Sequence, residues 1–279
     1  MDIRFVETLL MAIEEGSLAA AARQQAITPA AASQRVAALE AQMRVPLLVR
    51  DGRYMSATPE CEALLADLRQ MVILRSGLEG RLAEKRLVGP LRLGAISTAL
   101  SDFGPALIQR LRRAAPEVEL MLSPASSAEV FAQFEAGRLD AGVLVAPPFA
   151  LPKTMRFDVL AQQPIGLLQK PGTPQSMPFL VYSRAAWGGA LCWRALLAHA
   201  PTPQVLCDMD AVEILAQMVA DGLGQAVLPR WGGLERHHPN LSFRPLSETS
   251  REVGLLSWAR DSRRPVMELL RQTLHTLDV

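Results

Sequence analysis

Residues 28–43 read TPAAASQRVAALEAQM, and this stretch decides the fold of the N-terminal part of the chain. Thr28 is a residue type that caps helices, and Pro29 follows at the first helical position, where a missing N–H group costs nothing. Apolar side chains then recur at spacings of 4, 3 and 4, at Ala32, Val36, Leu39 and Met43. Because these spacings follow the 3.6-residue period, the stretch predicts an amphipathic helix that begins at residue 29.

The opposite face of this predicted helix is small and polar. It carries Ala30, Gln34, Ala37 and Ala41, with Ser33 and Arg35 on its flanks. A helix enters the DNA major groove only if slim outward side chains let its backbone approach the base edges. Ser17 can cap a shorter helix over residues 18–24, and residues 25–28 form the turn, so the sequence predicts a helix-turn-helix. An ordinary helical hairpin packed through alanines would share much of this pattern.

A small hairpin is predicted after the second helix. Residues 46–49 are extended, Asp51-Gly52 is a turn dipeptide, and residues 53–57 return, which makes a winged helix-turn-helix. Residues 23–53 hold five arginines against Glu40 and Asp51, a local net charge of +3 that can attract DNA phosphates. The candidate DNA-contacting residues are Thr28, Pro29, Ala30, Ser33, Gln34 and Arg35 on the helix and Arg53 on the wing.

Residues 59–87 are expected to form one long helix. Cys61, Leu64, Leu68, Met71, Arg75, Leu78 and Leu82 alternate spacings of 3 and 4, which is typical of a coiled-coil seam. We expect this helix to pair with a second copy through Leu64, Leu68, Met71, Leu78 and Leu82, so that two recognition helices meet an inverted repeat in DNA. The alternative is a helix that lies on its own domain.

The remaining residues alternate between strand and helix patterns. Strands are predicted at 91–96, 118–122, 141–145, 164–169, 179–182, 204–207, 225–228 and 253–258, and helices at 103–114, 128–136, 193–199, 212–220 and 265–277. This alternation is typical of parallel sheets with crossover helices. The last strand and helix are expected to return to the first half, which leaves a cleft between two α/β halves.

Residues 1–60 resemble the DNA-binding domain of the LysR-type transcriptional regulators. The matching landmarks are Gly16-Ser17, Ala21-Ala22, residues 31–33, Leu39-Glu40, Pro46-Leu47, Arg50 and Thr58-Pro59. Gln25, Arg44, Leu48 and Cys61 depart from the usual pattern of leucine, glycine, phenylalanine and glycine, respectively. Residues 91–94, 137–142 and 219–229 resemble the effector-binding domain of the same family, which is built like a periplasmic binding protein.

The resemblance covers essentially the whole chain and implies three parts. These are a winged helix-turn-helix at 1–58, a linker and dimerisation helix at 59–88, and an effector domain at 89–279. Within the effector domain, subdomain I would span about 89–160 and 255–279, and subdomain II about 161–254. The implied function is sequence-specific transcription regulation by a homodimer or homotetramer that binds double-stranded DNA and a small effector.

Candidate effector residues follow the ends of predicted strands. Ser97 and Thr98 follow the first strand, and Ser126 and Ser127 follow the second. Hydroxyls and N–H groups at helix starts suit a carboxylate or phosphate, although all four residues can also act as ordinary helix caps. Asp210 and Glu213 lie near a helix start in the second half, and of these Glu213 is the fifth candidate. An acidic side chain there would favour an amino group, so an anionic ligand and an amino acid both remain open.

Composition narrows the class and the compartment. The chain has 279 residues, 49% of them hydrophobic, a formal net charge of +1 and three cysteines, which is typical of a soluble protein of a reducing compartment. The acidic N-terminus is no signal peptide, and no apolar run reaches the roughly 20 residues that a membrane span needs, so we expect a cytoplasmic protein without membrane contact.

Other function classes fit the sequence less well. We expect no enzyme, no metal site and no cofactor, because His237 and His238 are adjacent, a G-x-x-x-x-G-K loop is missing and the cysteines match no nucleophile motif. Two alternatives stay open. One is a small-molecule-binding module without a transcriptional role, and the other is a redox-sensing regulator that uses Cys192 and Cys207.

Overall fold

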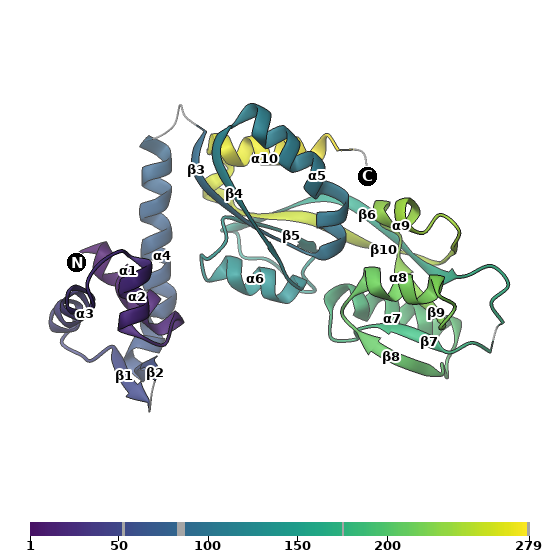
Figure 1. Cartoon of the computed structure of the whole chain (residues 1–279), viewed down its shortest axis with the longest axis horizontal. Coiled ribbons are helices and arrows are strands. Elements are labelled where there is room, and N and C mark those ends of the chain that lie inside the picture. The colour runs from purple at the N-terminus through teal and green to yellow at the C-terminus, as the bar shows by residue number, and fades with distance from the viewer. Residues whose placement is uncertain (52–53, 83–86, 175, 278–279) are drawn as a thin grey trace. The chain divides into compact units, whose positions relative to one another are not determined.

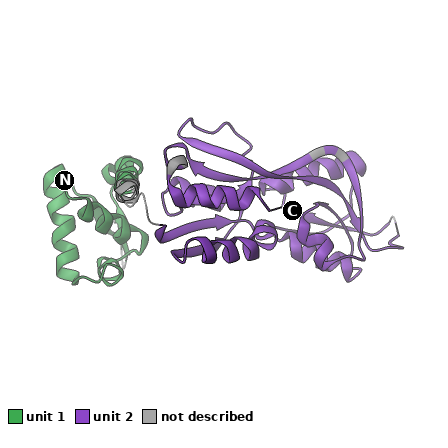
Figure 2. Ribbon diagram, turned by 90° about the horizontal axis from the view of Figure 1, so that it is seen from above, with its two compact units in different colours: residues 1–82 green, residues 83–279 purple. Residues whose placement is uncertain are grey.

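The structure is a computed structural model that describes residues 1–51, 54–82, 87–174 and 176–277, without the side chains of residues 73, 76–82, 247, 249, 262 and 263. The chain divides into two compact units, Met1–Leu82 and Ala83–Val279 (Figure 2). Within the described residues, no helix is both long and apolar enough to cross a membrane.

Unit 1 is a helix-turn-helix with a two-stranded wing and a long final helix. Its elements are α1 (Ile3–Glu14), α2 (Leu18–Gln24), α3 (Pro29–Met43), β1 (Leu48–Asp51), β2 (Tyr54–Ala57) and α4 (Pro59–Leu82). The Thr28 hydroxyl accepts the N–H of Ala31, and the Ser17 hydroxyl accepts the N–H of Ala20, so both predicted caps start their helices. The helix bounds at 18–24 and 29–43 are those predicted from the sequence.

The core of unit 1 lies between α1, α3 and α4. Ala32, Val36 and Leu39 of α3 are buried, as their spacing predicts. Helix α3 ends at Arg44, whose φ of 58° lies in the left-handed region, where glycine is common. This non-glycine residue adopts the conformation that ends the helix, so the departure from the usual glycine leaves the fold intact.

Helix α4 packs on its own unit over its first half. Cys61 and Leu68 belong to the buried core, and Leu64 and Met71 pack against it. The Arg75 guanidinium forms an ion pair of 2.8 Å with Glu7 of α1. Leu68 is buried inside the protomer, so its side chain is not available to a second copy, while the pairing role of the partly buried Leu64 and Met71 stays a prediction. The side chains of Leu78 and Leu82 lie outside the described residues.

Unit 2 contains an eight-stranded mixed sheet in the order β4-β3-β5-β10-β6-β9-β7-β8. Its strands are β3 (Val88–Ala95), β4 (Glu117–Pro124), β5 (Ala141–Val145), β6 (Met155–Gln169), β7 (Phe179–Tyr182), β8 (Val205–Met209), β9 (Gln225–Pro229) and β10 (Ser242–Trp258). Strands β6 and β10 are long, antiparallel and paired over most of their length, and Figure 1 shows them running between the two halves.

The two halves of unit 2 are named lobe I and lobe II. Lobe I contains β3, β4 and β5 with α5 (Ser97–Ala114), α6 (Ser127–Glu135) and α10 (Pro265–His275), and lobe II contains β7, β8 and β9 with α7 (Trp187–His199), α8 (Val212–Ala220) and α9 (Gly232–His237). A 3₁₀ turn, Ala259–Arg263, precedes α10. The sequence patterns locate all eight strands but miss α9 and the first parts of α5, α7, β6 and β10.

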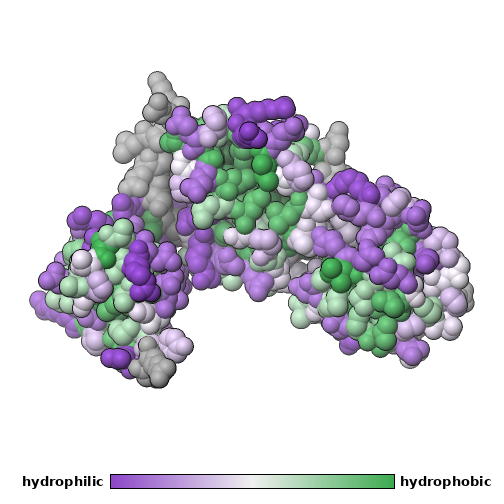
Figure 3. Space-filling view, viewed as in Figure 1, coloured by the Kyte–Doolittle hydropathy of each residue, from purple (hydrophilic) through white to green (hydrophobic). Residues whose placement is uncertain are grey.

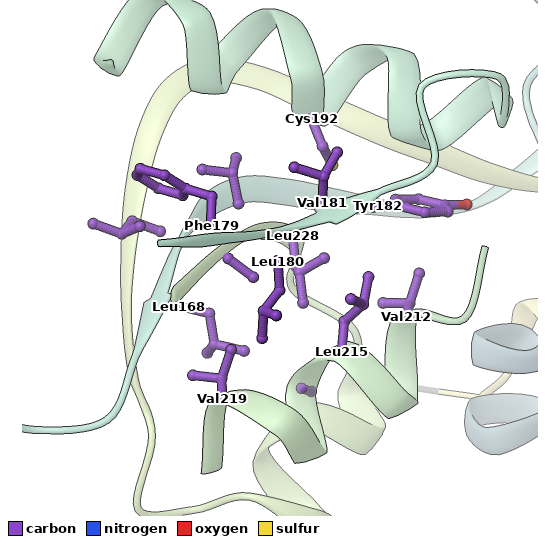
Figure 4. Close-up of a cluster of buried hydrophobic side chains, with 14 of the residues drawn as sticks. Leu168, Phe179, Leu180, Val181, Tyr182, Cys192, Val212, Leu215, Val219 and Leu228 are labelled. Atoms are coloured by element: carbon purple, nitrogen blue, oxygen red, sulfur yellow. The ribbon is translucent and has the colours of Figure 1, made fainter. Parts of the chain in front are cut away.

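The core of lobe II shows how the sheet is fixed to its helices. Buried side chains of β7 and β9, with Leu168 of β6, pack against Cys192 of α7 on one face and against Val212, Leu215 and Val219 of α8 on the other (Figure 4). Strand β7 is buried along its whole length, as its uninterrupted apolar sequence FLVY predicts. Tyr182 lies at the end of this strand, and Figure 4 shows its hydroxyl pointing away from the other labelled side chains.

Candidate nucleic-acid interface and effector cleft

The N-terminal end of α3 offers an exposed surface of slim side chains. Thr28, Pro29, Ala30, Ser33 and Gln34 are all exposed. Ala37 and Ala41 continue the exposed face along the helix. The helix therefore presents a carboxamide and hydroxyls beside small residues, which suits contacts with base edges and phosphates in a major groove.

Arg35 differs from the other predicted DNA-contacting residues. Its Nη1 donates to Gln25 Oε1 at 3.2 Å and to Thr8 Oγ1 at 3.4 Å, so its guanidinium is held inside unit 1. The Thr8 hydroxyl is fully buried and lies 2.6 Å from the same Gln25 oxygen. Gln25, where leucine is common in the family, is thus part of a polar network that joins α1, the turn and α3. Arg53, predicted on the wing, lies outside the described residues.

A cleft between the lobes of unit 2 is the candidate effector site. It has a cavity volume of about 270 Å³ and lies where α5, α6 and α8 begin. Its lining includes four of the five predicted residues, Ser97, Thr98, Ser126 and Ser127, and also Ile96, Pro124, Ala125, Tyr182, Asp210, Val212 and Arg251. Helix N-termini favour negative charge, so this geometry suits an anionic group.

The hydroxyl groups of three of the predicted residues form hydrogen bonds within the protein. The Ser97 hydroxyl donates to Glu213 Oε2 at 2.6 Å, which joins lobe I to lobe II. Ser127 is buried and its hydroxyl accepts the N–H of Val145 at 3.2 Å. The Ser126 hydroxyl takes part in a capping box with Glu129, which is the ordinary role that its position allows. Ser97, Ser126 and Ser127 therefore shape the cleft by the bonds that they make within the protein.

Arg251 at the centre of β10 was missed by the sequence patterns. Its side chain is fully buried, and its guanidinium donates to Gln163 Oε1 from Nε at 2.9 Å and to Thr98 Oγ1 from Nη2 at 3.0 Å. Among the described residues it forms no ion pair with a carboxylate. Its position two residues before the buried Val253 was the available signal, because alternate strand residues share a face.

Two further titratable groups line the cleft. Burial raises the pKa of Tyr182 to about 12, against the opposing effect of the nearby Arg251 charge. The pKa of Asp210 is raised, chiefly by loss of solvation and secondly by the negative charge of Glu129. The positive charge of Arg251 acts in the opposite direction. Arg251 is therefore the buried charge of the cleft, and the Asp210 carboxylate lines the more exposed part of the cleft.

Comparison with known proteins agrees with the division of the chain into an N-terminal unit and a larger C-terminal unit. Residues 3–62 match the model of the bacterial regulatory helix-turn-helix protein, lysR family, and residues 84–278 match the LysR substrate binding domain. The chain belongs to the LysR family of transcriptional regulators. It is accordingly a regulator with a DNA-binding helix-turn-helix and an effector-binding domain.

Individual relatives of this LysR-type regulator are distant. The chain is 24% identical over 245 residues to the HTH-type transcriptional activator IlvY of Salmonella typhimurium, with 82% of each chain covered. A full-length variant of OxyR from Pseudomonas aeruginosa superposes with a TM-score of 0.75 at 22% identity, covering 100% of this chain and 96% of that one. Full-length CbnR complexed with its target DNA superposes with a TM-score of 0.62 at 18% identity, with full coverage of both chains. At these identities the superpositions show the fold.

Cys61 and Cys192 of this LysR-type regulator do not have the environment of reactive thiols, because both are buried. All three are free, and Cys192 is buried in the core of lobe II. Burial raises the pKa of Cys192 to about 12, whereas a reactive thiol needs a lowered pKa. The geometry therefore disfavours the redox-sensing alternative.

Proposed function

We propose that this LysR-type regulator binds an inverted-repeat operator as a homodimer or homotetramer, and that a small effector in the cleft of unit 2 controls the arrangement of its DNA-binding units. The observation that supports DNA binding is the exposed surface of small and polar side chains at the N-terminal end of α3. Thr28, Pro29 and Ala30 would approach the groove with the helix N-terminus, and Ser33 and Gln34 would meet base edges. Gln34 has a carboxamide suited to bidentate contacts with adenine.

The arginines would supply the part of the affinity that is independent of base sequence. Arg53 on the wing would contact phosphate or the minor groove. Arg35 would act indirectly, because its guanidinium is held by Gln25 and Thr8. Affinity should fall with salt in proportion to the phosphates that are neutralised.

Two surfaces support pairing of protomers. On α4, the face that carries Ala63, Asp67 and Leu74 is exposed, and Leu74 keeps 48% of its surface accessible. In unit 2, β4 is an edge strand, and Met121 on it and Ile108 on α5 are each 49% exposed. Figure 3 shows apolar residues gathered over the part of unit 2 that contains β4. Unpaired edges and contiguous apolar surface are features of interfaces, so we infer that both surfaces pair.

The effector would act by stabilising one arrangement of the lobes. Besides Ser97 and Glu213, the lobes are joined by the Asp102 carboxylate of α5, which accepts the N–H groups of Gly232 at 3.1 Å and Gly233 at 2.7 Å. A ligand can shift such an equilibrium only by its difference in affinity for the two arrangements. We infer a non-catalytic protein of the cytoplasm, where its DNA target lies.

A gel-shift experiment tests the DNA-binding part of the proposal. Genomic fragments selected on the full-length protein would give an operator, and the wild type should protect two half-sites with two-fold symmetry in footprinting. A single protected half-site would contradict the dimeric arrangement. Effector control would then be read from Trp187, which packs against Phe131 and Phe149 at centroid distances of 5.9 and 5.6 Å, because its fluorescence should change when the lobes move.

A further inference from the structure

The cleft is lined by charges of both signs, with the positive charge in its buried part and the negative charge in its exposed part. Arg251 is fully buried, and its partners Gln163 and Thr98 are neutral. Asp210 lines the same cleft and is exposed. A buried positive charge without a carboxylate is unfavourable by itself, and a bound anion would compensate it.

The backbone around the cleft adds to the positive field at its bottom. Helices α5, α6 and α8 all begin at residues that line the cavity, and their N-terminal N–H groups carry partial positive charge. The Tyr182 hydroxyl lies beside Arg251 and remains a donor at neutral pH, since burial raises its pKa to about 12. The bottom of the cleft is therefore suited to a carboxylate.

The exposed part of the cleft has the opposite sign. Asp210 lines it, Glu213 approaches it through the bond to Ser97, and Glu129 caps α6 beside it. A second carboxylate or a phosphate placed here would meet like charges. An ammonium group would meet attraction instead. Ile96, Pro124, Ala125 and Val212 add apolar surface to the lining of the same cleft.

We propose that the effector is a small amino acid whose carboxylate binds above Arg251 and Thr98 and whose ammonium group faces Asp210. This inference rests on the proposed effector control and assigns its ligand class. The proposal predicts that the cleft prefers amino acids to three other ligand classes. A 2-oxo acid lacks the ammonium group, and dicarboxylates and sugar phosphates lack it and also bring additional negative charge near Asp210.

Isothermal titration of the full-length protein tests the ligand class. The twenty L-amino acids would be screened, and the tightest would be compared with its 2-oxo acid, with the amine that lacks its carboxylate, and with succinate. We expect at least tenfold weaker binding for each of the three analogues. The inference is overturned if no amino acid binds, or if the 2-oxo acid or succinate binds as tightly as the amino acid.

Substitutions test the two charges separately. Arg251→Gln should weaken amino acid binding at least tenfold, whereas Arg244→Gln, at an exposed position on the same strand, should leave it unchanged. Asp210→Asn, at an exposed residue that does not threaten folding, should weaken binding of the amino acid but not of its 2-oxo acid. Equal loss for both ligands in Asp210→Asn would contradict the ammonium contact.

The outcome is distinguishable from a failure of the proposed function. Operator binding by the wild type is measured separately in a gel shift. A sugar phosphate or nucleotide that binds the cleft and alters operator binding would overturn the amino acid assignment alone, and absence of operator binding would overturn the proposed function.

Discussion

The Ser97 hydroxyl donates a hydrogen bond of 2.6 Å to the Glu213 carboxylate, although the two residues lie 116 positions apart and in different lobes. Both residues were expected to contact the effector. In the structure they contact each other, so a hydrogen bond joins the two sides of the cleft. A bond of this kind, to a charged acceptor, contributes about 1.5–3 kcal/mol where it is shielded and less where it is exposed.

Glu213→Ala should loosen the lobes and weaken effector binding by about tenfold, since about 1.4 kcal/mol of preorganisation corresponds to that factor. Titration calorimetry of the effector measures the change. Gln217→Ala, at an exposed position on the same helix, is the matched control and should have no effect. Tighter binding in Glu213→Ala would mean that the bond opposes the bound state.

Gln34→Ala should relax base preference at one position of each half-site, with a loss of about 1–3 kcal/mol on the preferred operator. The physical reason is the loss of a carboxamide on the exposed face of α3. Gel shifts on operators with single base changes measure it, and Gln42→Ala, near the other end of α3, is the control. Unchanged discrimination in Gln34→Ala would show that this residue does not contact a base.

Arg35→Ala should reduce the stability of unit 1 by about 1 kcal/mol, because its bonds to Gln25 and Thr8 are lost. Urea unfolding of residues 1–82 measures this loss, and Arg23→Ala, at an exposed position on α2, should change stability little. A protein of unchanged stability with a smaller salt dependence of DNA binding would instead assign Arg35 a phosphate contact.

Gly189→Ala should destabilise unit 2 strongly, whereas Gly104→Ala should stabilise it by about 0.5–1 kcal/mol. A Cβ atom on Gly189 would lie 1.9 Å from the Ser183 carbonyl oxygen, so α7 could not approach the end of β7. A Cβ atom on Gly104 within α5 meets nothing within 4 Å. Thermal unfolding of both variants measures the difference, and a stable Gly189→Ala protein would refute the close approach.

Cys192 should resist alkylation by iodoacetamide at pH 8 while the protein is folded, because burial raises its pKa to about 12. The half-buried Cys207 should be modified first. The thiol ionises near its ordinary pKa of 9.0 in the unfolded chain but only near 12 in the folded protein. The contribution of Cys192 to the free energy of unfolding is therefore constant below pH 9 and decreases as the pH rises from 9 toward 12. Peptide mass spectrometry measures the labelling, and a Cys192–Cys207 disulfide after mild peroxide would contradict this account.

The sequence by itself determined the elements whose signals are local. Thr28-Pro29 starts α3, the spacing from Ala32 to Met43 selects its buried face, and the run FLVY gives β7, because capping and periodicity depend on neighbours within a few residues. Four residues of the effector cleft were found for the same reason, since helix starts after strands of a parallel sheet converge at one edge.

The tertiary structure decided what depends on partners far along the chain. Whether Leu68 faces a second copy or its own domain cannot follow from spacing, because α1 and a partner helix would both accept the same apolar stripe. The buried Arg251 guanidinium is hydrogen-bonded by Gln163, 88 residues away, and by Thr98, 153 residues away. A charged residue in a strand is expected at the surface, and its burial here follows from polar partners that only the fold brings together.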